Sequence, residues 1–355
     1  MRTLVTGNMG YFGRALENVL QDAGHSVKGW DCGLFSGWDD DVRDIRDISA
    51  ADLSHFDNIV HLAALSNDAT GELAPQMTRE INLAAAVRIA ELAREAGVRR
   101  FVFASSCSVY GAGSGVVNDE NSTLNPLTEY ARSKASAEVA MARLSTDGFW
   151  PVSLRFATLY GDSPSFRSDL VVNRMVCTAW RYGSIFVVGD GSISRPLLHV
   201  RDASNAIEAV LQADRATVTG EVFNVGASNA NYRIFELAEL VGSLFDEVRL
   251  EHGGTADTRD YAVDFRKFQD RFKGWNPGMS PLDGAREVLA ALDSGRLADL
   301  RVQGADWGPT DRGQWLRSLR REAKVSGDLR WADSRLLPTS DLLPHGDRAV
   351  PVRPV

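Results

Sequence analysis

The chain has 355 residues, of which 44% are hydrophobic and 24% are charged, and its formal net charge is −8. These values are typical of a globular protein with a sizeable core, and the acidic balance argues against a nucleic-acid or anionic-membrane surface. Three widely spaced cysteines and six histidines without ligand spacing favour a reduced, cytoplasmic setting and argue against a metal site.

The amino terminus predicts a dinucleotide-binding turn. Residues 2–6 are predicted to form a buried strand, too short for a signal peptide, and residues 14–20 have helical periodicity. Between them lie Gly7, Gly10 and Gly13, in a GxxGxxG spacing. Glycines between a strand and a helix let backbone N–H groups meet a pyrophosphate, whereas a tight turn without a ligand is the alternative.

A second predicted strand, residues 25–30, ends at Asp31. A carboxylate about 20 residues beyond such glycines accepts hydrogen bonds from an adenosine ribose and repels a 2′-phosphate. The sequence therefore favours NAD over NADP, unless Asp31 is an ordinary surface aspartate. A third strand, residues 58–64, ends in the small residues Ala63 and Ala64, against which a flat ring or ribose could lie.

Two long helices and two further strands complete the predicted first domain. Residues 76–96 have amphipathic helical periodicity, and a second helix is predicted to end near residue 146. Strands are predicted over residues 100–104 and 151–156. Strands alternating with helices predict an α/β fold with a doubly wound parallel sheet. No apolar run approaches the roughly 18 residues of a membrane span.

The second long helix carries Tyr130 and Lys134, four residues apart and so on one face. A lysine beside a phenol favours the phenolate, so we expect Tyr130 to exchange a proton with an alcohol near neutral pH. Alone, Tyr-x-x-x-Lys also arises by chance in amphipathic helices. The hydroxyls of residues 105–108 follow the fourth strand, where open α/β sheets bind ligands.

The pattern of predicted strands and helices changes along the chain, and these changes predict the domain boundaries. Residues 1–165 are predicted to form the NAD-binding domain, with segments around residues 197–225 completing its sheet. Residues 166–295, with short elements interrupted by glycine and proline, predict a smaller mixed α/β substrate lobe. Residues 111–125 are predicted to form a loop. Residues 296–355 are predicted to form an irregular extension, packed on the body or partly disordered, with one helix near residues 314–321.

Together, these pieces resemble the extended short-chain dehydrogenase/reductase family, in its nucleotide-sugar epimerase/dehydratase branch. The resemblance covers residues 1–295. The matching segments are Thr6-Gly7-x-x-Gly10-x-x-Gly13, Asp31, Asp41-Val42-Arg43-Asp44, His61-Leu62-Ala63-Ala64, Asn82, Ser105-Ser106-x-Ser108-Val109-Tyr110-Gly111, Tyr130-x-x-x-Lys134, Leu154-Arg155-Phe156, Gly189-Asp190-Gly191, Arg195-Pro196-x-x-His199-Val200-x-Asp202 and Arg259-Asp260-Tyr261.

The resemblance implies an NAD site and a catalytic set. The implied cofactor residues are Gly7, Gly10, Tyr11, Phe12 and Gly13 at the pyrophosphate, Asp31 at the adenine ribose, Asp41 and Val42 at the adenine, and Leu62, Ala63, Ala64, Asn82 and Phe156 elsewhere along NAD. Ser106 would bind the reacting sugar oxygen, and Tyr130 would be the acid/base. Lys134 would bind the nicotinamide ribose and lower the pKa of the tyrosine.

The resemblance also implies substrate contacts and an assembly. The implied substrate residues are Cys107, Ser108, Thr158, Asn173, Arg195 and Arg259. The two arginines would clamp a sugar nucleotide's diphosphate, with solvated surface charges as the alternative. A homodimer through helices 76–96 and 128–146 is expected.

Departures from the family pattern narrow the expected chemistry. Where 4,6-dehydratases carry an Asp-Glu pair, this chain has Cys107 and Ser108, and related decarboxylases carry a glutamate at the second position. A hydroxyl at 108 is common in sugar 4-epimerases. Thr158 stands where asparagine is common, which reshapes the pocket beside the sugar or phosphate.

We therefore predict an NAD-dependent epimerase of a nucleotide-diphosphate sugar, acting through a transient keto-sugar, with C4 as the expected carbon. An NAD(H)-dependent keto-sugar reductase or dehydrogenase is the first alternative. A 4,6-dehydratase and a non-catalytic NAD-binding protein are the others. The base and the sugar stay open at this point.

Overall fold

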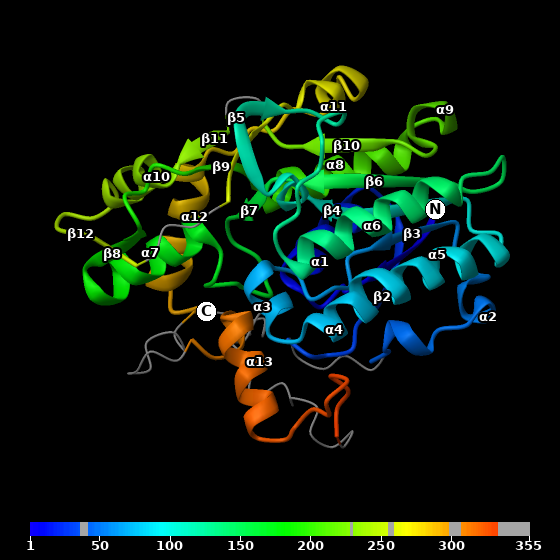
Figure 1. The fold of residues 1–355 in the computed structure, drawn as a ribbon, viewed down its shortest axis with the longest axis horizontal. Coiled ribbons are helices and arrows are strands. Elements are labelled where there is room, and N and C mark those ends of the chain that lie inside the picture. Colours follow the sequence, from blue (N-terminus) through cyan, green and yellow to red (C-terminus); the bar gives the residue numbers. More distant parts are fainter. Residues whose placement is uncertain (36–41, 228–229, 255–258, 298–306, 333–355) are drawn as a thin grey trace, which may run out of the picture.

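The computed structural model describes residues 1–35, 42–227, 230–254, 259–297 and 307–332. A large α/β domain and a smaller lobe lie side by side, and α13 lies below the junction between them (Figure 1). Asp41, which was expected to border the adenine, lies outside the described residues. Among the described helices, none is long and apolar enough to cross a membrane.

A six-stranded parallel sheet forms the centre of the large domain, and this confirms the predicted doubly wound α/β class. In spatial order its strands are β10 (Val222–Val225), β6 (Trp150–Phe156), β4 (Arg100–Ser106), β3 (Asn58–His61), β1 (Arg2–Thr6) and β2 (Ser26–Trp30). The register pairs Ser106 at the end of β4 with Phe156 at the end of β6. Because all six strands are parallel, their carboxyl ends meet along one edge, where α/β sheets bind ligands.

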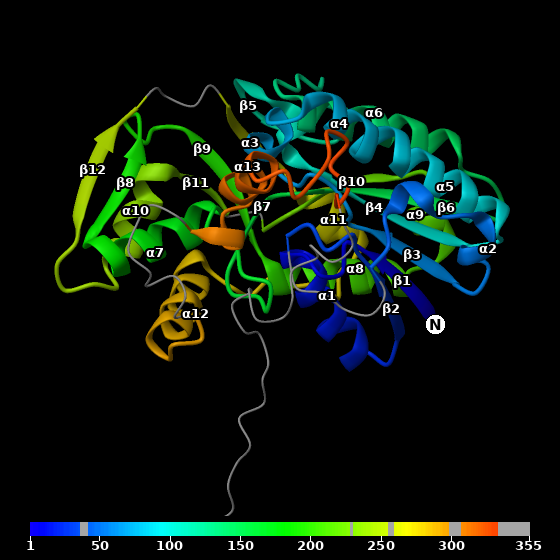
Figure 2. The same cartoon turned by 90° about the horizontal axis from the view of Figure 1, so that it is seen from below.

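Helices cover both faces of this sheet (Figure 2). One face carries α4 (Pro75–Arg79), α5 (Ala86–Glu95) and α6 (Glu129–Arg143), and the other carries α1 (Tyr11–Asp22) and α8 (Val200–Gln212). The connections contain the short helices α2 (Ala50–Leu53), α3 (Asp68–Glu72), α9 (Arg215–Val218) and α11 (Arg266–Arg271). Between α4 and α5 the helix continues through a π-helical segment, Glu80–Ala85, which contains the buried Asn82.

The smaller lobe has its own strands and its own apolar core. A three-stranded sheet contains β7 (Thr158–Tyr160), β9 (Ser194–His199) and β11 (Asn231–Arg233), and β8 (Ser184–Val188) pairs with β12 (Arg249–Gly253). Helices α7 (Val171–Tyr182), α10 (Ile234–Gly242) and α12 (Pro281–Asp293) pack around them. Of the segments expected near residues 197–225, only β10 joins the large sheet, because β9 pairs within the lobe.

The predicted loop over residues 111–125 instead begins with a strand, β5 (Ala112–Asn118). Its partner is β13 (Asp260–Val263), which lies far away in the sequence. A strand that is stabilised by such a distant partner leaves little local signal, because pairing compensates for a weak intrinsic propensity.

The carboxyl-terminal segment is packed against the rest of the protein over residues 307–332. It contains α13 (Arg312–Arg321), which starts two residues before the predicted helix. Leu316, Leu319, Val325 and Leu329 form an apolar cluster with residues of the large domain such as Leu34. The rest of the predicted extension, residues 298–306 and 333–355, lies outside the described residues.

The buried His61 at the end of β3 makes the free energy of unfolding depend on pH. Burial, followed by the nearby charge of Lys134, lowers the pKa of His61 to about 3. Because an unfolded histidine has a pKa near 6.5, only the unfolded chain takes up this proton as the pH falls below that value. The contribution of neutral His61 to the free energy of unfolding is thus complete above pH 6.5. It decreases by about 1.4 kcal/mol for each pH unit between that value and the folded-state pKa of about 3.

We expect His61→Phe to remove this part of the pH dependence. Phenylalanine can keep the ring stacking that His61 makes with Phe101 and Phe103. Urea unfolding at pH 7.5, 6 and 5 should show a smaller loss of unfolding free energy in the variant than in the wild type. Equal losses in the two proteins would contradict the assignment.

Candidate active site

A cavity of about 610 Å³ lies at the carboxyl edge of the large sheet and extends to the smaller lobe. Its volume is in the range of small-molecule sites. The predicted site residues that line it are Gly7, Gly10, Tyr11, Phe12, Gly13, Asp31, Leu62, Ala63, Ala64, Ser106, Ser108, Tyr130, Lys134, Phe156, Thr158, Arg195 and Arg259. The fold therefore brings together residues that are far apart in the sequence.

The glycine turn is shaped for close backbone approach. Gly7 has φ +75°, and a Cβ there would lie 2.7 Å from the backbone nitrogen of Ala63. A Cβ on Gly13 would lie 2.3 Å from the carbonyl oxygen of Gly7. Gly10 is the N-cap of α1 and has no side chain to cap the helix. The first N–H groups of α1 are thus presented to the cavity, where they suit a phosphate.

Two aromatic residues connect this turn to the strands beside it. The hydroxyl of Tyr11 donates to the carbonyl oxygen of Gly161 at 2.9 Å, and Ser163 Oγ donates to the carbonyl oxygen of Tyr11 at 2.6 Å. The ring of Phe12 packs edge-on against Phe156, with centroids 5.0 Å apart. These contacts hold the start of α1 in place against the end of β6.

Asp31 lies at the end of the cavity where the adenosine ribose is expected. Its Oδ1 accepts a hydrogen bond from the backbone N–H of Gly33 at 2.8 Å. Burial raises the pKa of Asp31, and the Gly33 N–H and the charge of Arg312 oppose that rise. A buried acceptor at this place fits a ribose hydroxyl and disfavours a 2′-phosphate.

The three predicted catalytic residues meet in the middle of the cavity. Helix α6 begins after Thr128, whose hydroxyl accepts the N–H of Ala131, and this cap places Tyr130 in the first turn. Tyr130 and Ser106 both line the cavity, and the Ser106 hydroxyl lies close enough to lower the pKa of the Tyr130 phenol. The ammonium nitrogen of Lys134 donates to the carbonyl oxygen of Ala104 at 2.7 Å and lies 5.9 Å from the Tyr130 ring centroid.

The sequence predicts that Lys134 lowers the pKa of Tyr130, but the pKa of Tyr130 is raised in this structure. Burial raises the pKa of Tyr130 to about 12, the charge of Asp68 adds to that rise, and the hydrogen bond with Ser106 opposes it. Burial also lowers the pKa of Lys134 to about 7, while the carboxylate of Glu138 opposes that change. Desolvation outweighs the charge–charge effect because both side chains are buried. The phenol is therefore protonated at neutral pH in this structure.

Two arginines lie at the end of the cavity formed by the smaller lobe. Arg195 donates to the carbonyl oxygen of Arg259 and packs over the ring of Tyr261, 5.4 Å from its centroid. The guanidinium of Arg259 forms an ion pair with Asp68, which begins α3 in the large domain. The smaller lobe thus brings two guanidinium groups to the lining of the cavity.

Of the predicted site residues that the structure describes, four are not among those that line the cavity. Asn82 uses its amide to bind the backbone N–H and carbonyl of Leu65, and Asn173 binds the backbone of Gly161 and Arg167 in the same way. The side chains of both are satisfied by backbone groups, so we interpret them as residues that hold the cavity-lining loops in place. Direct contact with ligand is not expected from either.

Cys107 and Val42 lie behind the cavity wall. The thiol of Cys107 donates to the carbonyl oxygen of Arg155 at 3.2 Å, and burial raises its pKa, so a reactive thiolate is disfavoured. Val42 pairs with Asp31 in an isolated β-bridge. Its contribution is to place Asp31 and not to touch the adenine directly.

Several lining residues were not predicted from the sequence. Arg167 is buried, pairs with Asp169 at 2.8 Å, donates to Ser66 Oγ at 3.2 Å and lowers the pKa of Tyr130 by its charge. Arg312 comes from α13 in the carboxyl-terminal segment. Both lie in polar, irregular stretches, where an arginine that enters a cavity has the same local context as one that faces solvent.

Comparison with known proteins identifies the group to which this arrangement belongs. Residues 3–226 match the family described as NAD dependent epimerase/dehydratase. The chain belongs to this family. An uncharacterised UDP-glucose epimerase, YtcB, from Bacillus subtilis (strain 168) is 31% identical, and the match covers 83% of this chain and 98% of the relative. NAD is thus the cofactor, and the chain is an enzyme of this family.

Other members of the NAD dependent epimerase/dehydratase family show similarity of the same extent. The UDP-glucose 4-epimerase of Mycolicibacterium smegmatis is 29% identical over 81% of this chain and 97% of its own length. The solved structure of MoeE5 in complex with UDP-glucuronic acid and NAD has a TM-score of 0.74 and 26% identity, and the match covers 83% of this chain and all of that one. The similar proteins also include a dTDP-glucose 4,6-dehydratase.

Proposed function

We propose that this family member interconverts two epimers of a nucleotide-diphosphate sugar at C4. The observation that carries the proposal is that Ser106, Tyr130 and Lys134 line one cavity together with the glycine turn of the large domain and two arginines of the smaller lobe. Ser108 lines this cavity, and among the described residues its buried Oγ has no hydrogen-bond partner. A buried hydroxyl without a partner is costly unless a ligand group binds it.

The proposed reaction is a reversible oxidation at one sugar carbon. NAD, held by the glycine turn and Asp31, would supply the hydride acceptor for that carbon and the hydride donor for the return step. The phenolate form of Tyr130, which the positive charge of bound NAD would favour, takes the proton of the sugar hydroxyl as the keto group forms, and Ser106 donates a hydrogen bond to the same oxygen. After the keto-sugar has turned in the cavity, Tyr130 returns the proton, so neither protons nor electrons are consumed overall.

The residues after Ser106 distinguish epimerisation from elimination of water. Cys107 is buried behind the wall and Ser108 is neutral, so neither supplies the carboxyl group that a 4,6-dehydratase uses at these places. The similar proteins include epimerases and a dehydratase, so the argument for epimerisation rests on these two side chains.

A direct test is to incubate the purified enzyme with UDP-, dTDP-, GDP- and CDP-sugars without added NAD and to separate the products. Appearance of the C4 epimer, with no change in NADH absorbance, is the expected result. A keto-sugar reductase would instead consume added NADH in proportion to product. A 4,6-dehydratase would form a 4-keto-6-deoxy sugar. Either of these results would replace the proposal.

We expect Arg195→Met to weaken substrate binding while leaving turnover largely intact. Arg195 lines the cavity from the smaller lobe, and methionine keeps its apolar stem. Loss of a charged hydrogen-bond donor to a diphosphate should raise KM about tenfold to hundredfold. Steady-state kinetics with the active sugar nucleotide measures KM and kcat separately. A drop in kcat with unchanged KM would contradict a role of Arg195 in binding the diphosphate.

We also propose that two copies of the chain associate through α5 and α6. Val139 on α6 is a large apolar side chain that is 52% exposed. Light scattering after gel filtration should give twice the mass of the chain. A monomer at micromolar concentration would refute this part of the proposal without affecting the chemistry.

A further inference from the structure

The carboxyl-terminal segment, residues 307–332, crosses from the smaller lobe to the large domain at the NAD end of the cavity (Figure 2). On the smaller lobe, the hydroxyls of Ser168 and Thr310 lie 2.9 Å apart, and Asp311 forms an ion pair with Arg174 of α7 at 2.5 Å. These contacts attach the start of the segment beside the mouth of the cavity.

On the large domain, the segment binds the loop that follows Asp31. The indole nitrogen of Trp315 donates to the carbonyl oxygen of Leu34 at 2.9 Å, and that of Trp331 donates to the carbonyl oxygen of Cys32 at 2.9 Å. Arg312 donates to the carbonyl oxygen of Phe35. Three side chains of one segment thus hold consecutive parts of the loop that places the ribose-binding aspartate.

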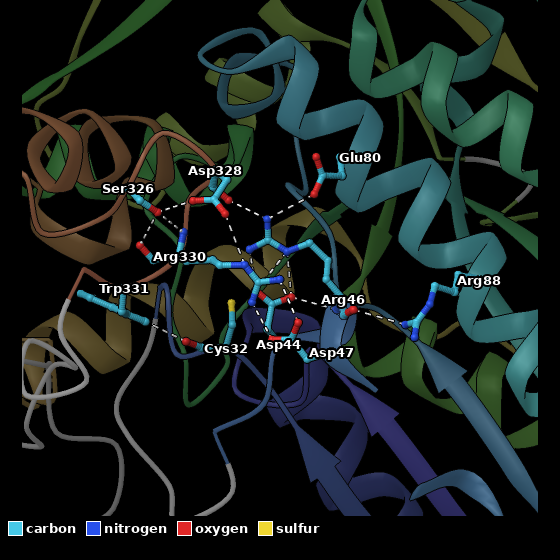
Figure 3. Close-up of polar contacts among 10 residues, drawn as sticks. All are labelled: Cys32, Asp44, Arg46, Asp47, Glu80, Arg88, Ser326, Asp328, Arg330 and Trp331. Carbon is cyan, nitrogen blue, oxygen red and sulfur yellow. Dashed lines mark hydrogen bonds and ion pairs between the residues drawn. The ribbon is translucent and has the colours of Figure 1, made fainter. Parts of the chain in front are cut away.

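A charge network attaches the end of the segment to the same domain (Figure 3). Arg330 pairs with Asp47 at 2.5 Å and with Asp44 at 3.5 Å. Arg46 binds Asp44 at 2.5 Å and donates to the carbonyl oxygen of Asp328 at 2.6 Å. A network that shares several charges is held more firmly than an isolated surface pair.

Two residues of the segment reach the cavity itself. Arg312 and Leu329 line it together with Asp31. Arg312 is only 4% exposed, and its other hydrogen bonds go to the carbonyl oxygen of Pro309 and to Ser165 Oγ. Burial, followed by the charge of Arg167, lowers the pKa of Arg312 to about 9, and the carboxylates of Asp169 and Asp31 oppose that change only in part. A phosphate-bearing cofactor supplies the missing negative charge.

We propose that residues 307–332 complete the NAD site and that Arg312 is a positive contact to the dinucleotide. The other residues of the segment hold the loop after Asp31 in place and so slow NAD release. The segment closes the adenosine end by holding the loop after Asp31 against both lobes. An enzyme that returns its hydride to the same substrate needs no cofactor exchange, so slow release suits it. The proposal rests on NAD as cofactor and not on the identity of the sugar.

The test measures NAD release from the purified holoenzyme in the absence of sugar nucleotide. Released NAD is captured by excess alcohol dehydrogenase and ethanol and is followed as NADH. Arg330→Glu places a negative charge among Asp44, Asp47 and Asp328 and should raise the release rate about tenfold or more. Arg312→Met should raise it about tenfold to hundredfold through loss of the charged contact.

Arg321→Glu is the matched control. It makes the same charge change on the same segment, but Arg321 has a side chain that is 74% exposed and pairs only loosely with Glu322, at 3.7 Å. Its release rate should equal that of the wild type. Trp331→Phe, which removes only the indole N–H and keeps most of the ring, should raise the rate severalfold and serves if Arg330→Glu does not fold.

Wild-type release rates in folded Arg312→Met and in folded Arg330→Glu or Trp331→Phe would overturn the proposal. Because no sugar nucleotide is present, this result is independent of the epimerase assay. If the epimerase assay fails and the release rates change as expected, the segment's role stands and only the proposed reaction falls.

Discussion

Replacement of Tyr130 by phenylalanine is expected to lower kcat by about three orders of magnitude while the protein keeps its NAD. The variant lacks only the phenol hydroxyl that lies in the cavity with Ser106, so the proton of the sugar hydroxyl has no acceptor. Positioned acid–base groups contribute up to about 10⁴-fold to rate. The glycine turn and Asp31 are unchanged, so NAD should copurify with the variant at the wild-type ratio.

The matched control for this prediction is Tyr182→Phe, at the exposed end of α7. It removes the same atom from another tyrosine and should leave both kcat and bound NAD unaltered. Turnover of Tyr130→Phe within a few-fold of the wild type would remove Tyr130 from the mechanism. Loss of NAD together with turnover would instead assign it a binding role.

Replacement of Arg155 by methionine is expected to lower the free energy of unfolding by about 3–5 kcal/mol. Arg155 on β6 and Glu138 on α6 are each 4% exposed, and their side chains meet at 2.7 Å. Arg155 also donates to the hydroxyl of Tyr110 at 2.9 Å. Removing it leaves the carboxylate of Glu138 buried without its ionic partner, which is costlier than the pair's net contribution.

The double variant Arg155→Met/Glu138→Met separates a broken pair from a lost side chain. With both charges gone, no buried charge stays uncompensated, so the double variant should be more stable than Arg155→Met by about 2 kcal/mol or more. Chemical denaturation of the wild type, the two single variants Arg155→Met and Glu138→Met, and the double variant gives the comparison. A double variant that is destabilised by the sum of the two single changes would mean that the pair itself, and not the desolvation of one charge, dominates.

The Arg155–Glu138 pair also connects stability to the site. Glu138 lies one turn after Lys134 on α6, and its carboxylate raises the pKa of that lysine against the effect of burial. The ion pair therefore holds the helix that carries Tyr130 against β6. Its carboxylate also supplies part of the negative electrostatic potential at Lys134. In the sequence, Leu154-Arg155-Phe156 is visible only as a short family motif without a physical role.

The local motifs allowed much of the site to be predicted, because their chemistry depends on near neighbours. Gly7, Gly10 and Gly13 lie within one turn and need only a strand before them and a helix after them. Tyr130 and Lys134 share a helix face through their spacing alone. The parallel sheet followed from the alternation of strands and helices, since each element carries its own periodicity.

The sign of the Tyr130 pKa shift could not be predicted in this way. Helix spacing places a charge beside the phenol, but the shift depends on how completely both groups are removed from water, and Asp68 and Arg167 also contribute. Burial is a property of the packed molecule. The same reason applies to Asn82 and Asn173, whose amides satisfy buried backbone groups that exist only after the loops have folded.

The sequence by itself determined the class of sheet, the glycine turn, the carboxylate at the end of β2 and the serine, tyrosine and lysine that we propose as the catalytic set. The tertiary structure decided which arginines enter the cavity and where the carboxyl-terminal segment lies. Arg312 reaches the same cavity as Asp31 although more than half of the chain separates them. Short-range periodicity carries no information about such contacts, because they depend on how two lobes and a segment pack together.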